Sequence, residues 1–204
     1  MTSNRKSTLI RSVLIGAIVG AGGGVAMAMF AMIAGATYQG TGFFTPMYHI
    51  AVPLIGGEPM MTSASKAAAG SQFHLEVGPA MLGFAAHMMT AVAFGAVFGL
   101  LVHVVRPRGV SALALGAIFG VAVMVFMSFA GLPVVASVLG GGDAVRNMPK
   151  MVGWATFTGE HILYGIVLGA GALIARETSK DLVTRDASPP VAVAPDPEPR
   201  RVGM

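Results

Sequence analysis

Two matching runs decide the fold: Ile15-Gly16-Ala17-Ile18-Val19-Gly20 and Leu115-Gly116-Ala117-Ile118-Phe119-Gly120. Met27 follows the first run at the same spacing as Met127 follows the second. Each copy is followed by another apolar segment with a histidine near its start, His87 in the first half and His161 in the second. The pattern predicts a duplicated hairpin, and therefore two pairs of helices.

The composition is that of a membrane protein. Hydrophobic residues make up 54% of the sequence, charged residues only 11%, and the mean hydropathy is +0.74, whereas a soluble domain carries about 25% charged residues. Residues 9–36, 79–105, 110–132 and 151–175 are each long enough to cross a bilayer, which takes roughly 20 apolar residues. Hydrocarbon offers no water to backbone groups, so each segment should be helical. We expect an all-α membrane protein with four transmembrane helices in two tandem hairpins (2+2).

Lysine and arginine placement predicts the orientation. Basic residues precede the first helix, occupy the turn between the second and third, and follow the fourth. This predicts a bacterial-type plasma membrane protein with both termini in the cytoplasm, residues 1–8 forming the N-terminal segment. The net charge of +4 is explained by such anchoring, so nucleic-acid binding is not expected. The first segment resembles a signal peptide, but its long apolar run and its repeat partner favour a retained helix.

Two connecting regions differ in character. The outer loop 37–78 contains an apolar, aromatic stretch at 42–55 that is too short and too rich in proline to span, and we expect it to lie in the interface or to cap the bundle. A short helix capped by Thr62 or Ser63 is predicted after it. Residues 177–204 become dense in proline, which predicts a disordered cytoplasmic tail.

Small residues four positions apart occur in every predicted span. Because lipid supplies little hydrophobic force between helices, close backbone approach at such residues carries much of the packing. At 100° per residue, the small-residue faces include Met27 and lie within about 80° of His87 and His161. These three side chains, and Met127 by repetition, are therefore predicted to point into the bundle.

The same four residues are the first candidate site. At ~1.5 Å per residue, both histidines lie roughly 12–15 Å below the outer surface, and the two methionines lie near that level. Imidazole and thioether ligands suit Cu(I), and histidine pairs also suit the axial positions of haem. The sequence therefore predicts haem b or copper as a cofactor held by His87 and His161, with Met27 and Met127 nearby.

Three further residues could extend such a site. His49 and His74, in the outer loop, are candidate metal ligands. Glu160 is the sole carboxylate within a predicted span, and ionisable groups at that depth are costly enough to suggest a function. We interpret it as a candidate for a proton or ion path. Each of these residues also has a purely structural interpretation, since a buried histidine needs only a carbonyl partner.

No catalytic motif accompanies these groups, so enzymatic activity is not expected. The chain has no cysteine, which excludes disulfides, thiolate metal sites and covalently attached c-type haem. A structural or accessory membrane protein, embedded in the bilayer and associated with another membrane complex or with itself, is the first hypothesis. Haem or copper binding and a small ion or solute transporter or channel are the alternatives.

Overall fold

The computed structural model describes the backbone of residues 2–186 and the side chains of residues 7–176. Within that range every regular element is a helix. Four helical stretches are long and apolar enough to cross a membrane: Ser7–Ala36, Val77–Val105, Val110–Val138 and Trp154–Arg176. The prediction of an all-helical chain with four apolar spans is therefore confirmed, while the duplication of the hairpin stays a prediction.

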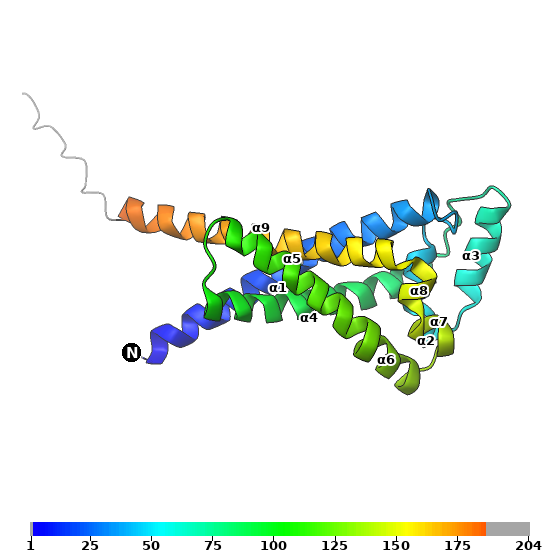
Figure 1. Ribbon diagram of the computed structural model, residues 1–204, viewed down its shortest axis with the longest axis horizontal. Coiled ribbons are helices and arrows are strands. Elements are labelled where there is room, and N and C mark those ends of the chain that lie inside the picture. Colours follow the sequence, from blue (N-terminus) through cyan, green and yellow to red (C-terminus); the bar gives the residue numbers. More distant parts are fainter. Residues whose placement is uncertain (1, 187–204) are drawn as a thin grey trace, which may run out of the picture.

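The helices form an elongated bundle with two different ends (Figure 1). The long elements are α1 (Thr2–Ala36), α4 (Val77–Val105), α5 (Val110–Phe126) with its continuation α6 (Leu132–Val138), and α9 (Trp154–Asp186). The short ones are α2 (Thr45–Ile55), α3 (Glu58–Ala68), α7 (Gly142–Arg146) and α8 (Met148–Val152). The short helices gather at one end, called here the cap end. The first turn of α1 and the last turn of α9 lie at the opposite end, called here the basic end.

Several boundaries differ from those expected. Helix α1 begins at Thr2, and α9 begins at Trp154 and continues to Asp186, into the region predicted as tail. Residues 187–204, which carry most of that predicted disordered tail, lie outside the described residues. The predicted cap at Thr62 or Ser63 is wrong, because α3 already begins at Glu58 with a proline in its first turn. Ser63 is instead buried and bonds the hydroxyl of Thr45 at 2.7 Å.

The third span contains a π-helical turn that joins α5 to α6. This turn, η1 (Met127–Gly131), is closed by a bond from the Leu132 N–H to the Met127 carbonyl. Pro133 follows directly and has no N–H for the carbonyl four residues earlier, against which its ring would also clash. The wider turn relieves this conflict and lets the helix run on to Val138 rather than end at residue 132.

Glycine contacts hold the long helices together in two pairs. In the α1–α4 pair, a Cβ atom on Gly20 would lie 2.7 Å from the Cα of Gly95, and in the α5–α9 pair a Cβ on Gly116 would lie 2.8 Å from the backbone N of Gly169. Both distances are too short for any side chain. The backbones therefore touch at these positions, as expected for helices packed in lipid.

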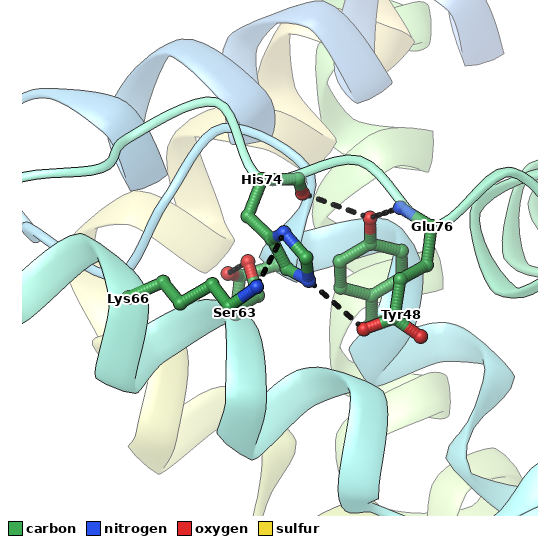
Figure 2. A network of polar contacts seen from close by, with 6 residues as sticks. Tyr48, Ser63, Lys66, His74 and Glu76 are labelled. Carbon is green, nitrogen blue, oxygen red and sulfur yellow. Dashed lines mark hydrogen bonds and ion pairs between the residues drawn. The ribbon is translucent and has the colours of Figure 1, made fainter.

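A polar network fixes the cap end (Figure 2). The Tyr48 hydroxyl donates to the His74 carbonyl at 3.0 Å and accepts from the Glu76 N–H at 2.7 Å. The His74 ring bonds Glu76 Oε1 at 3.0 Å and Lys66 Nζ at 3.3 Å. Helices α2 and α3 and the segment leading into α4 are thus tied together. The apolar stretch 42–55 thus contributes helix α2 to the cap end.

We expect Gly95→Ala to lower the melting temperature of the purified protein and Gly22→Ala to leave it unchanged or raise it. The new methyl group at Gly95 would overlap the backbone of Gly16 and Gly20, whereas at Gly22 it meets nothing within 4 Å. Overpacking typically costs about 1–3 kcal/mol, roughly 2–4 °C per kcal/mol for a chain of this size. Thermal unfolding followed by size-exclusion chromatography measures the difference, and equal melting temperatures would contradict the packing described.

Candidate functional site

A cavity of about 410 Å³ lies between the long helices at the cap end. Its walls come from α1, α4, α9 and the α5–η1–α6 span, and α2, α7 and α8 close it from the cap side. Most of the lining is apolar and includes Phe94, Val123, Leu132 and Phe157. A mainly apolar cavity with a few polar groups is the usual form of a small-molecule site.

The structure brings most of the predicted site residues to this one cavity. His87, His161, Met27 and Met127 all line it, from four different helical elements. His49 lines it from the cap. The convergence expected from helix periodicity and depth is therefore present. His74 is not among the lining residues, because its ring is held in the cap network by Glu76 and Lys66.

Each of the three lining histidines bonds a backbone carbonyl through one ring nitrogen. His87 Nε2 lies 2.9 Å from the Gly24 carbonyl, His161 Nδ1 lies 2.7 Å from that of Phe157, and His49 Nε2 lies 2.8 Å from that of Ala144. A carbonyl only accepts, so the nitrogen facing it carries the hydrogen. In a neutral ring the other nitrogen is then an acceptor. These acceptors are Nδ1 of His87, Nε2 of His161 and Nδ1 of His49.

Glu160 adds a carboxyl group to the same lining. Its side chain is 4% exposed, and among the described residues nothing bonds its buried Oε1 atom. Polar atoms buried without a partner are rare because each one costs free energy. Glu160 Oε1 is thus a buried oxygen in the cavity lining to which a ligand could donate a hydrogen bond. Its neighbour His161 bonds its own helix instead.

Sequence reasoning missed Tyr164, which lies on α9 one turn beyond Glu160. Its hydroxyl donates to the Ala91 carbonyl of α4 at 2.6 Å, and its ring packs against Gly23 of α1. It therefore joins three helices and lines the cavity. A tyrosine in the middle of an apolar span was the available signal, because a buried hydroxyl requires a partner.

The structure supports the metal hypothesis with fewer candidate ligands than the sequence predicted. Across the part of the chain that the structure describes, no three side chains among His, Asp and Glu are grouped so that they could hold a metal ion. The cavity does hold the two imidazoles and two thioethers that were predicted together. Bis-imidazole haem ligation requires two of these four residues, so haem makes the smaller demand on the site.

Comparison with known proteins adds no assignment to this geometry. The chain matches no model of a protein family, no curated protein and no solved structure. Functional inference therefore rests on the residues of the cavity and on their contacts.

His49 should make folding stability depend on pH. Burial lowers the pKa of His49 below its ordinary value of 6.5, and the bond to Ala144 only partly opposes this. The unfolded chain then binds the proton more readily, so the stability contributed by neutral His49 is complete above about pH 6.5 and is lost as pH falls below that value. We expect the fall in melting temperature from about pH 7.5 to pH 5.5 to be smaller in His49→Gln than in the wild type. The difference should be roughly 2–4 °C for each kcal/mol of stability that is lost when the unfolded chain binds the proton at His49.

Glutamine donates to the same carbonyl but does not titrate, which makes His49→Gln a matched variant. Parallel pH profiles for the wild type and His49→Gln would refute the assignment.

Proposed function

We propose that this is a multi-pass membrane protein that binds an apolar small molecule with a hydrogen-bond-donating head group in the cap-end cavity. The observation that carries the proposal is the set of acceptors at the cavity wall. His87, His161 and Glu160 line it, each imidazole keeps one nitrogen that bonds no carbonyl, and among the residues described no lysine or arginine lines the cavity.

The lining defines what such a ligand must offer. Phenylalanine, leucine and methionine side chains favour an apolar body, which can enter from the bilayer. The acceptors favour a hydroxyl or ammonium group, because each hydrogen bond to a buried acceptor contributes about 0.5–1.5 kcal/mol and more when one partner is charged. An anionic head would find no lysine or arginine among the described lining residues to balance its charge.

Binding of 4-decylphenol should be about tenfold or more tighter than binding of its methyl ether, because the ether has the same apolar body but no donor, and 1.4 kcal/mol corresponds to tenfold. Equilibrium binding to protein in lipid nanodiscs, with empty nanodiscs as background, measures both affinities. The difference should shrink in a protein carrying His161→Phe and Glu160→Gln.

Glu76→Gln is the matched control, since this carboxyl group belongs to the cap network and lies outside the cavity lining. It should keep the preference of the wild type for the phenol. Equal affinities of the phenol and the ether for the wild-type protein would defeat the proposal.

Haem b is a second candidate, supported by the setting of His161. Its Nδ1–H donates to the Phe157 carbonyl, which orients the ring and leaves Nε2 as an acceptor, and metal-binding histidines are usually held in this way. His87 is anchored through the opposite nitrogen and would ligate through Nδ1. Copper, bound by these rings with Met27 and Met127, stays a prediction.

Protein from its native membrane, or mixed with haemin, should then show a Soret band that is lost in His161→Ala. His74→Ala should keep the band, because His74 belongs to the cap network. Absorption spectroscopy with analysis for iron and copper provides the test. A colourless, metal-free preparation that haemin and Cu(I) leave unchanged would exclude the cofactor.

The location we propose is a bacterial-type plasma membrane, with the basic end in the cytoplasm, because arginines gather there. An accessory role beside another membrane complex is compatible with ligand binding. The glycine faces already pack within the chain, so a protein partner would meet aliphatic side chains such as Ile18, Val104 and Ile118, which are 72%, 70% and 67% exposed.

A further inference from the structure

A second cavity, of about 330 Å³, lies at the basic end between α1, α4 and α9. Its lining is more polar than that of the first and includes three arginines, Arg11, Arg106 and Arg176, together with His103. Each arginine belongs to a different part of the chain: the first turns of α1, the residue that ends α4, and α9. The arginines therefore converge from three directions on one hollow.

The deeper part of this cavity is apolar. Phe98 and Leu168 are 2% and 1% exposed and form its inner wall, with Val19 beside them. Gly16 and Gly99 also line it, at the place where the backbones of α1 and α4 are in contact. The cavity is therefore amphipathic, with a basic rim and an apolar interior.

Arg176 is held in position before any ligand arrives. One of its terminal nitrogens, Nη1, donates to the carbonyls of Arg106 and Pro107 in the turn between α4 and α5. A guanidinium group carries five N–H donors in a rigid fork, so these bonds leave donors on its other nitrogens. The Arg106 backbone adopts the left-handed conformation at φ 54°, and the turn that begins there presents its carbonyls to Arg176 on α9.

Anchoring of the bundle to a charged surface would need no such convergence. Arg108 lies in the same turn, two residues from Arg106, and is exposed without lining the cavity. Within residues 7–176, whose side chains are described, no aspartate or glutamate lines the cavity either. The described lining of the cavity thus carries basic side chains and no acidic one.

We propose that this cavity binds the phosphate group of an anionic amphiphile, with a membrane phospholipid as its source. The arginines form charge-assisted bonds to the phosphate oxygens, and the first methylene groups of the chains lie against Phe98 and Leu168. Basic pockets between transmembrane helices at the level of the head groups suit this ligand chemistry. The site is separate from the cap-end cavity, so either proposal can fail without the other.

The test uses full-length protein in a neutral detergent and three probes at matched concentrations: dioctanoyl phosphatidylglycerol, dioctanoyl phosphatidylcholine and inorganic phosphate. Phosphatidylglycerol should raise the melting temperature in a saturable way, because a ligand that binds only the folded state stabilises it. The other two probes should raise it far less. An equal shift with phosphatidylcholine would overturn the proposal, and an equal shift with inorganic phosphate would overturn the lipid source.

Arginine variants test the residues. Arg11→Gln and Arg106→Gln should each raise the half-saturating phosphatidylglycerol concentration about tenfold, the effect of one lost charge-assisted bond. Arg108→Gln should leave the half-saturating concentration unchanged. If Arg108→Gln raised it equally, the effect would come from the net positive charge of this end and not from the cavity. Arg106→Lys keeps the charge but loses the fork, so it should fall between Arg106→Gln and the wild type. An affinity unchanged in both Arg11→Gln and Arg106→Gln would refute the site.

Discussion

The rest of the structure depends on the backbone contact between glycines in the two helix pairs. Where α1 meets α4 and α5 meets α9, there is no room for a Cβ atom. Such contact draws each pair together without a hydrophobic driving force, which lipid does not supply. Because the contacts have no room for side chains, the larger side chains lie elsewhere on these helices. Methionine, phenylalanine and histidine line the cap-end cavity, and α6 stands apart from α1 at that end (Figure 1).

The same absence of side chains explains how polar groups are satisfied inside the bundle. The His87 ring bonds the carbonyl of Gly24 on α1, and the Tyr164 hydroxyl bonds the carbonyl of Ala91 on α4, so both acceptors belong to small residues. Each bond ties one long helix to another through an acceptor that already belongs to a helix. Glu160 is the exception in this region, because one of its oxygens is buried with no bond from any described residue. The exception lies in the cavity wall, where a ligand can act as the partner.

The four spans and the convergence of His87, His161, Met27 and Met127 on one cavity followed from the sequence, because both depend on helix length and helical periodicity. Hydrogen-bond partners did not follow, since the carbonyl that each side chain reaches depends on how the helices pack. The π-turn before Pro133 was missed for a related reason: proline predicts a break, and only packing decides whether the helix ends or widens. His74 was grouped with the other histidines by composition alone, and the fold of the cap separates it from them.

The two cavities border one packed layer from opposite sides. Tyr164 lines the cap-end cavity, Phe98, Leu168 and Ala172 line the basic-end cavity, and all four belong to one buried cluster. A continuous path between the cavities would have to displace Phe98 and Leu168, and exposing such a side chain costs about 1.5–3 kcal/mol each. It would also break the bond between Tyr164 and α4. The layer therefore favours two separate binding sites over a channel, and Glu160 would act at the wall of one of them.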